Sequence, residues 1–214
     1  MSSSLTDKSS DGVYRDYKEY DIDLVRQYHT HICDICAETS ARASGVLDGV
    51  AYVKDGKHEH QQDFPNSTWL YGYYNFFSCN TRDDVVYDLF AYVKECIRDY
   101  IGMDERAWTQ CWVNTHPKDG LLQKHFHQYP IHWYLSIYPQ STATVFYEGD
   151  MDDGPEIYRI TNEVGKLYIG PGDRTHEVVP TGEFDRMPRI TIAGNVLRSS
   201  DTQYQCKTFS FVPI

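Results

Sequence analysis

The stretch His125-Phe126-His127-Gln128-Tyr129-Pro130-Ile131-His132-Trp133-Tyr134 joins a histidine pair to the start of an apolar segment that ends at Tyr138. Only Phe126 separates the first two imidazoles. Residues two apart on an extended strand point to the same face, so His125 and His127 can be directed at one point. The pair is therefore the first half of a candidate metal site.

Two later residues complete the pattern. His176 follows a Gly-Pro-Gly turn, and Arg189 lies inside an apolar segment. A permanent charge is rare inside an apolar strand unless it has a partner. Three imidazoles that converge from distant segments, together with one buried cation, predict a metal site beside an anion site.

Length and charge restrict the classes of protein that fit. The chain has 214 residues and a net charge of −11, which is spread without a basic run. This argues against binding of duplex nucleic acid through a broad positive surface, but one or two arginines can still hold a small anion. No apolar window is long enough for a membrane span, so we expect no membrane partner. The oligomeric state is not predicted.

The cysteines indicate a reducing environment. Their spacing is irregular, and a chain of this size does not need disulfides for stability. We interpret them as reduced thiols of a cytoplasmic protein: Cys33, Cys36, Cys79, Cys96, Cys111 and Cys206.

The first half of the chain reads as mainly helical. Apolar residues recur at roughly helical spacing within Asp21–Ala43, and Gly45 and Gly49 are expected to end that helix. Lys54–Asn66 is polar and is predicted to be a loop.

Two more elements are expected before residue 105. Trp69–Phe77 is rich in aromatic residues, which favours a strand. Thr81 is predicted to cap a helix that ends near Tyr100, because an amphipathic apolar stripe runs from Val85 to Ile97.

After Arg106 short β-branched and aromatic runs alternate with turns, which is typical of a sandwich or barrel. The expected strands are Thr109–Asn114, Ile131–Tyr138, Thr144–Glu148, Ile157–Ile160, Lys166–Ile169, His176–Val179, Arg189–Leu197 and Thr208–Val212. The predicted class is α+β in a single domain, 1–214, with a loose tail (1–12), a mainly helical part (13–105) and a β core (106–214).

Other histidine pairs have the same spacing and need a separate interpretation. His29 and His31 lie on a predicted helix, where residues two apart diverge, and His58 and His60 lie in a polar loop. A zinc site at His29, His31, Cys33 and Cys36 lacks a second ligand pair at finger-like spacing. We therefore expect these residues to be structural.

From Trp112 onward the chain resembles the iron(II)- and 2-oxoglutarate-dependent oxygenases, in particular small phage and marine bacterial members that carry a His-x-His motif. The matching residues are Trp112-Val113-Asn114, Gly120, His125-Phe126-His127, Trp133-Tyr134-Leu135, 165–172, His176 and 189–195. The resemblance covers roughly the C-terminal half. It implies a double-stranded β-helix (jelly roll) and a phage or bacterial origin.

The resemblance also implies a set of metal ligands. His125 and His176 match the two histidine ligands of iron, and His127 occupies the position of the usual acidic ligand. Iron oxygenases of this kind mostly use two histidines and one carboxylate. The third ligand is therefore open: His127 itself, a carboxylate such as Glu148 or Asp150, or no residue, which would admit halide.

Arg189 matches the residue that grips the distal carboxylate of 2-oxoglutarate, and a guanidinium fork suits that group. Asn114, Tyr134 and Tyr168 are candidates to complete the cofactor site. His125, His127 and His176 are then both the metal ligands and the catalytic residues. The implied reaction is hydroxylation of a small molecule or a protein side chain through a ferryl intermediate.

Two other interpretations remain open. Residues 165–176 also resemble the second motif of cupins, which would bind a metal without 2-oxoglutarate and would not need Arg189. A non-enzymatic structural protein on a jelly-roll scaffold would bind no metal, because many such scaffolds carry no chemistry.

Overall fold

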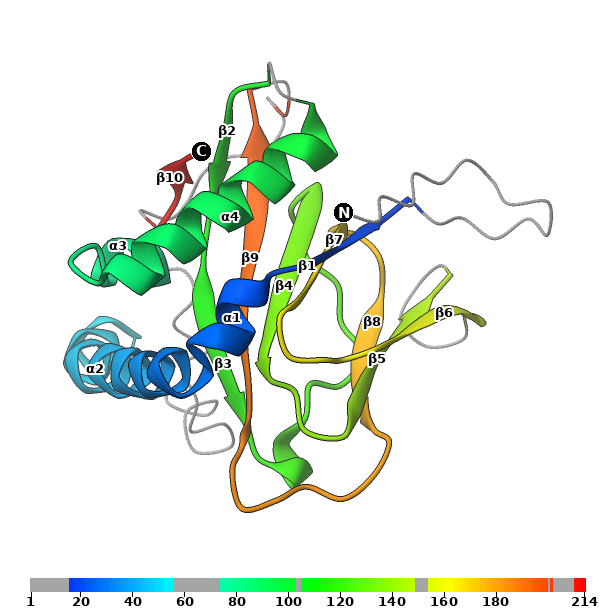
Figure 1. The fold of residues 1–214 in the computed structure, drawn as a ribbon, viewed down its shortest axis with the longest axis horizontal. Coiled ribbons are helices and arrows are strands. Elements are labelled where there is room, and N and C mark those ends of the chain that lie inside the picture. Colours follow the sequence, from blue (N-terminus) through cyan, green and yellow to red (C-terminus); the bar gives the residue numbers. More distant parts are fainter. Residues whose placement is uncertain (1–15, 56–73, 103–104, 149–153, 200, 202–209) are drawn as a thin grey trace.

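The structure is a computed structural model that describes residues 16–55, 74–102, 105–148, 154–199, 201 and 210–214 (Figure 1). Its helices are α1 (Asp23–Gln27), α2 (His29–Asp55), α3 (Phe76–Cys79) and α4 (Asp84–Ile101), with a 3-10 turn, η2, at Lys118–Gly120. Its strands are β1 (Lys18–Asp21), β2 (Ala107–Thr109), β3 (Trp112–His116), β4 (Ile131–Tyr138), β5 (Thr142–Tyr147), β6 (Glu156–Thr161), β7 (Lys166–Pro171), β8 (His176–Pro180), β9 (Arg189–Arg198) and β10 (Val212–Pro213).

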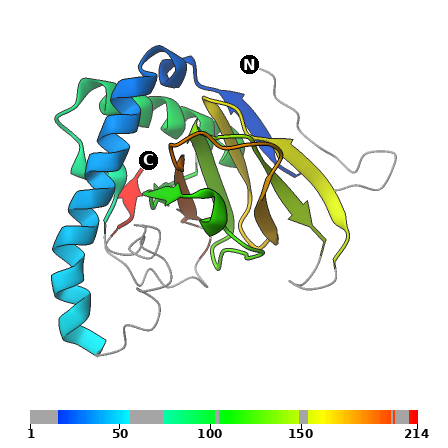
Figure 2. The ribbon, with the colours of Figure 1, turned by 90° about the horizontal axis from the view of Figure 1, so that it is seen from below.

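The strands form two antiparallel sheets. The larger has the order β1-β7-β4-β9-β2-β10, with β3 paired to the other part of the same edge of β9, and the smaller has the order β6-β5-β8. In Figure 2, α2 and the yellow-green strands of the smaller sheet lie on opposite sides of the molecule. The predicted α+β class is confirmed.

Alternation along β4 explains how the larger sheet is covered on both sides. Trp133 faces the helices, where its ring stacks near Phe77 of α3 with centroids 6.4 Å apart. Tyr134 points the other way and stacks on Tyr168 of β7 at 5.1 Å. The Tyr168 ring also lies 4.8 Å from that of Phe146 on β5, so aromatic rings fill the space between the two sheets.

The inner face of the larger sheet is unusually polar. His132, Tyr134 and Ser136 share this face of β4, because successive strand residues alternate. In the register of β4 with β9, His132 is opposite Asn195 and Ser136 is opposite Thr191, so these β9 residues point the same way. All of these residues are buried, which places a polar interior where an ordinary core would be apolar.

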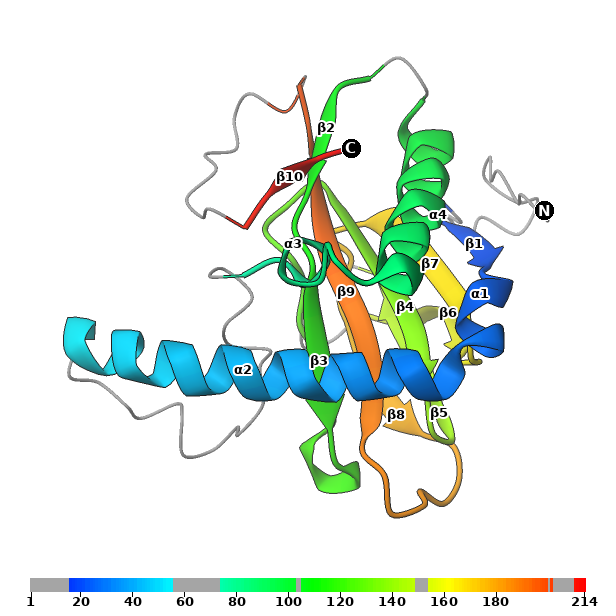
Figure 3. The same ribbon diagram turned by 60° about the vertical axis from the view of Figure 1, so that its left-hand side comes forward.

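The helices cover the outer face of the larger sheet. α2 crosses β3, β9 and β4 (Figure 3), and α4 buries the predicted apolar stripe through Val86, Leu89, Val93 and Ile97. The cap predicted at Thr81 is wrong, because the side chain of Asp83 accepts the hydrogen bond of the Val86 amide at 2.9 Å. A carboxylate at this position satisfies a free amide and also favours the positive helix terminus.

Three predictions for the first half need correction. The helix expected over Asp21–Ala43 begins after strand β1, is interrupted at Tyr28, and continues through Gly45 and Gly49 to Asp55. Glycine lowers helix propensity by only about 1 kcal/mol, which is too little to end a long helix by itself. Lys54 and Asp55, expected in a loop, are the last residues of α2, and 56–66 lie outside the described residues.

The strand expected over Trp69–Phe77 is also wrong where it can be compared. Residues 69–73 lie outside the described part, and Phe76 already begins α3. The side-chain oxygen of Asn75 accepts hydrogen bonds from the amides of Phe77 and Ser78 at 3.1 and 3.3 Å. This capping interaction, rather than the aromatic composition, decides the local structure.

The β half agrees closely with the prediction. Seven expected segments coincide with strands, although Thr109–Asn114 is divided into β2 and β3 at Gln110 and Cys111. The eighth, Thr208–Val212, reaches β10 only at Val212, and 202–209 are not described.

Two sequence predictions about the protein's environment can also be compared with the structure. Among the described residues, no helix is long and apolar enough to cross a bilayer. Five of the six cysteines are described, and all five are free thiols.

Candidate metal centre

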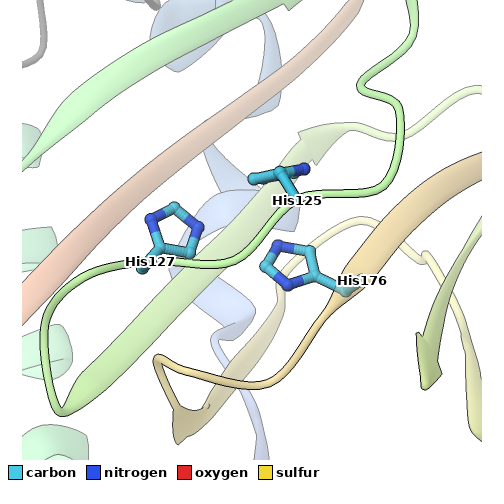
Figure 4. A group of neighbouring side chains, drawn as sticks. All are labelled: His125, His127 and His176. Atoms are coloured by element: carbon cyan, nitrogen blue, oxygen red, sulfur yellow. The ribbon is translucent and has the colours of Figure 1, made fainter. Parts of the chain in front are cut away.

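Three histidines from two segments come together between the sheets. His125 and His127 lie in the segment that leads into β4, and His176 is the first residue of β8 (Figure 4). One ring nitrogen from each lies within 4.8 Å of the other two. The spacing suits a single metal ion that holds all three imidazoles.

The main chain fixes the positions of these residues. The amide of His125 donates to the carbonyl of His176 at 2.9 Å, and the amide of His176 donates back at 2.8 Å. The amide of His127 donates to the carbonyl of Gly172 at 2.7 Å. Hydrogen bonds that do not depend on any ligand thus hold the three backbones together.

Hydrogen bonds to the rings decide which nitrogen of His125 and His176 is free. Nδ1 of His125 lies 2.7 Å from the carbonyl oxygen of Gln123, and Nδ1 of His176 lies 2.9 Å from that of Arg174. Since a carbonyl can only accept, both Nδ1 atoms carry the proton. Nε2 of each ring is then left with a lone pair, as in many metal-bound histidines.

His127 differs from the other two. Its Nε2 is buried and makes no hydrogen bond with any residue that the structure describes. A buried polar atom without a partner is costly, and an ion or another polar ligand at this point would remove the cost. This atom supports the assignment of a ligand site between the three rings.

Electrostatics keep the three rings in the form that binds metals. Burial lowers the pKa of His125, and it lowers the pKa of His127 and His176 much further. The neighbouring imidazoles lower the pKa of His127 and His176 again, because protons on adjacent rings repel. At neutral pH the rings are therefore neutral, with lone pairs available for a cation.

The candidates for the third metal ligand are His127, a carboxylate such as Glu148 or Asp150, or no residue. The metal-capable group found among the described residues consists of histidines alone. Glu148 is exposed, and its amide bonds to the carbonyl of Pro155. Asp150 lies outside the described residues. A donor set of three histidines is the arrangement that the geometry favours.

Arg189, the predicted anion-binding residue, is buried at the start of β9 with 2% of its surface exposed. Its Nη1 donates a long hydrogen bond of 3.5 Å to Oγ1 of Thr191, and its Nε has no partner among the residues that the structure describes. No carboxylate of the described part of the chain forms an ion pair with it. Burial lowers its pKa to about 10, so it remains charged at neutral pH.

The charge of Arg189 acts on the histidine cluster. It contributes to the lowered pKa of His176, and it is opposite His116 in the register of β3 with β9. Burial raises the pKa of Tyr134, and the charge of Arg189 opposes that shift because it favours the phenolate. A buried cation thus acts electrostatically on one of the three imidazoles, that of His176.

The other three residues that were predicted to bind the cofactor lie in different surroundings. Tyr134 and Tyr168 stack on each other on the inner face, and the hydroxyl groups of Tyr168 and Tyr158 lie 3.2 Å apart. Asn114 is buried, where its side-chain oxygen accepts from Nε1 of Trp112 at 2.9 Å and its amide group faces Thr191 at 3.4 Å. Of the two tyrosines, Tyr134 is the one on whose pKa the charge of Arg189 acts.

Sequence reasoning missed two histidines on the inner face. His132 stacks on His127 with ring centroids 3.6 Å apart and planes 10° apart. His116 is buried opposite Arg189, and burial lowers its pKa to about 3. Strand alternation could have identified His132, since it shares a face with Tyr134.

Of the other two histidine pairs, His29 and His31 can be compared with the prediction that their side chains diverge on a helix. Nε2 of His29 bonds to the carbonyl of Ile137 at 2.9 Å, whereas Nε2 of His31 bonds to Asp83 at 2.9 Å. The two rings therefore diverge, and Cys36 is buried in the core. His58 and His60 are outside the described residues.

Comparisons with known proteins give limited information. No family model and no curated protein matches the chain. Three solved structures are similar to parts of it: a Pseudomonas putida prolyl-4-hydroxylase (17% identity, TM-score 0.32), the epimerase SnoN in complex with Fe³⁺, α-ketoglutarate and nogalamycin RO (11%, 0.41), and the non-heme monooxygenase ThoJ in a nickel complex (10%, 0.37).

The extent of these matches is uneven. The alignments cover 41%, 85% and 48% of this chain, and 50%, 78% and 49% of the hydroxylase, the epimerase and the monooxygenase. The chain thus matches about half the length of the first and the third. At these identities and TM-scores the likenesses establish neither family nor activity, so the function rests on the residues of the site.

Proposed function

We propose that this protein is an iron(II)- and 2-oxoglutarate-dependent dioxygenase, built on a double-stranded β-helix, that hydroxylates a small molecule or a protein side chain. The observation that carries the proposal is the combination of three neutral imidazoles with a buried Arg189 that forms no ion pair with a carboxylate of the described residues. The imidazoles can hold a cation, and the guanidinium can hold an anion. Few reaction types need both groups at one place.

Charge balance favours a dianionic ligand. A divalent ion on neutral histidines, together with Arg189, brings three positive charges into a buried site that has no carboxylate among the described residues. Unbalanced charge in a low-dielectric interior is strongly unfavourable. A keto acid with two carboxylates offsets two of these charges, one group at the metal and one at Arg189.

The donor set fits iron(II) but does not select it. Imidazole nitrogen suits iron, nickel, copper and zinc alike, and cellular availability decides which of them is loaded. With His127 in place of an acidic ligand, the protein contributes no negative charge to the ion. The chelating keto acid would supply the anionic oxygens instead.

Each group of residues then has a defined role. Bound iron with 2-oxoglutarate and oxygen supplies the oxidant that hydroxylates a C–H bond. His125 and His176 present Nε2 because their Nδ1 protons are held by backbone carbonyls. Arg189 orients the distal carboxylate, and the rings of Tyr134, Tyr168 and Phe146 limit the access of water.

An anaerobic titration tests the proposal. Iron(II) is added to the metal-free protein, followed by 2-oxoglutarate, and the weak visible charge-transfer band of the chelate is followed. The band is expected at one equivalent of iron and to depend on Arg189. Oxygen should then convert 2-oxoglutarate to succinate.

One observation favours a second candidate, a cupin-like metal protein that does not use 2-oxoglutarate, because three histidines without an acid also suit such a site. In that case the protein would bind metal but show no response to 2-oxoglutarate. A protein that binds no metal would contradict both candidates and leave the structural role.

A further inference from the structure

His132 is a buried histidine next to the metal centre that has no part in the proposed reaction. It is the second residue of β4, and only 4% of its surface is exposed. Its ring lies face to face with that of His127, with centroids 3.6 Å apart and planes inclined by 10°. No other pair of rings in the cluster is as close or as nearly parallel.

The three candidate ligands are held in different ways. The rings of His125 and His176 are each fixed by a hydrogen bond from Nδ1 to a backbone carbonyl. The ring of His127 has no such bond to any residue of the described ranges, and its Nε2 is unpaired. Of the rings around His127, that of His132 is the nearest and most nearly parallel, since those of His176 and Trp112 lie 5.3 and 6.1 Å away.

His132 is itself anchored by a chain of buried polar groups. Its Nδ1 lies 3.3 Å from Oδ1 of Asn195, the residue opposite it on β9. The amide group of Asn195 donates to Oε1 of Gln110 at 2.9 Å, and Nε2 of Gln110 donates to Oγ of Ser210 at 2.9 Å. Since Asn195 uses its NH₂ group on Gln110, its oxygen is left to accept from His132.

The backbone beside this chain has no spare room. A Cβ added at Gly194 would lie 2.0 Å from the carbonyl oxygen of Gln110 and 2.5 Å from the Trp133 ring. The strand that carries Asn195 is thus pressed against its neighbours. Anchors with this little freedom transmit their position to the ring that they hold.

We propose that His132 is the positioning residue for the third metal ligand: by stacking on His127, and through its anchor Asn195, it holds that imidazole in the orientation that binds the ion. This inference rests on the proposed metal centre and adds the residue that completes it. A metal on His127 draws electron density from its ring, and the facing π surface of His132 then attracts it more strongly.

Cobalt(II) alone is the probe, because it is stable in air and its visible bands report the number and geometry of its ligands. The variants are His132→Leu, which removes the aromatic surface, and His132→Phe, which keeps it. His29→Leu is the matched control: it changes a histidine that stacks near Tyr138, with centroids 5.5 Å apart, outside the cluster. Thermal unfolding of each variant checks the fold.

His132→Leu is expected to weaken cobalt binding about ten- to a hundredfold and to change the visible spectrum, as loss of a supporting residue does at other metal sites. His132→Phe should bind within about threefold of the original protein and keep its spectrum. Asn195→Ser, which leaves the ring and removes its anchor, should cause a smaller loss of the same kind.

Unchanged affinity and spectrum in His132→Leu would overturn the inference, and so would a His132→Phe variant that is as weak as His132→Leu. If His132→Leu does not fold, Asn195→Ser decides by the same two readouts. Cobalt binding does not need 2-oxoglutarate. A protein that binds cobalt but ignores 2-oxoglutarate would contradict the oxygenase and leave the role of His132 intact.

Discussion

His125 and His176 are joined by two backbone hydrogen bonds, one in each direction, although they come from different segments of the chain. The bridge uses only main-chain atoms, so replacement of either side chain leaves it in place. His176→Ala should therefore fold and still lose a ligand. We expect metal binding to fall below stoichiometric levels, as measured by metal analysis after anaerobic reconstitution. Full metal content in this variant would remove His176 from the site.

His127→Asp places a carboxylate where the ring of His127 lies. An anionic oxygen suits iron(II) and offsets part of the positive charge, so iron affinity should be kept or increased. His127→Ala provides the contrast and should weaken iron binding about tenfold or more, because it leaves two ligands. Isothermal titration with iron(II) under nitrogen measures both variants. Equal affinities in all three proteins would show that residue 127 does not contact the metal.

Arg189→Met should separate stability from function. Arg189 is buried without a carboxylate partner in the described part of the chain, so its charge costs stability in the ligand-free protein. The substitution is expected to raise the free energy of unfolding by about 1–3 kcal/mol, measured in urea on the metal-free protein. It should also raise the 2-oxoglutarate concentration needed for the visible band at least about tenfold, with metal content unchanged.

Arg189→Lys is the matched control for that experiment. It keeps the charge but loses the two-pronged donor geometry, so 2-oxoglutarate binding should be intermediate. A destabilised Arg189→Met protein that binds 2-oxoglutarate normally would contradict the assigned role of the guanidinium.

The metal-free protein should lose stability in mild acid. Burial holds the pKa of His116 and His132 at about 3, against about 6.5 in an unfolded chain. Below about pH 6.5 these histidines bind protons in the unfolded state but stay unprotonated in the folded state. The free energy of unfolding therefore decreases as the pH falls. These two residues contribute about 2.7 kcal/mol per pH unit together.

Urea unfolding of the metal-free protein between about pH 7 and pH 5 measures this slope. His116→Phe should reduce it by about 1.4 kcal/mol per pH unit, and a stability that does not change over this range would contradict the buried neutral state.

Gly194→Ala tests the packing behind the metal centre. The added carbon would overlap the carbonyl oxygen of Gln110 at 2.0 Å and the ring of Trp133 at 2.5 Å. Overpacking of this kind costs about 1–3 kcal/mol, and the movement of β9 should also weaken metal binding. Gly102→Ala is a useful comparison, because a Cβ there meets nothing within 4 Å and only the positive φ of 99° opposes it.

Much of the β half could be predicted from the sequence, because alternation and turn residues are local signals. Ile131–Tyr138 is a strand with the predicted bounds, and Arg189 begins β9. The helical half was harder to predict. Gly45 and Gly49 do not end α2, and the aromatic run before Phe77 does not form a strand where it is described, because caps and packing outweighed composition.

The sequence by itself determined which residue types are present for the site: His125 and His127 at strand spacing, a later His176, and a charged Arg189 in an apolar segment. Only the tertiary structure decided that the three histidines meet, that His132 lies against His127, and that Arg189 has no ion-pair partner among the described residues. The physical reason is that strand periodicity fixes the face on which a side chain lies, whereas the register between distant strands fixes which faces meet.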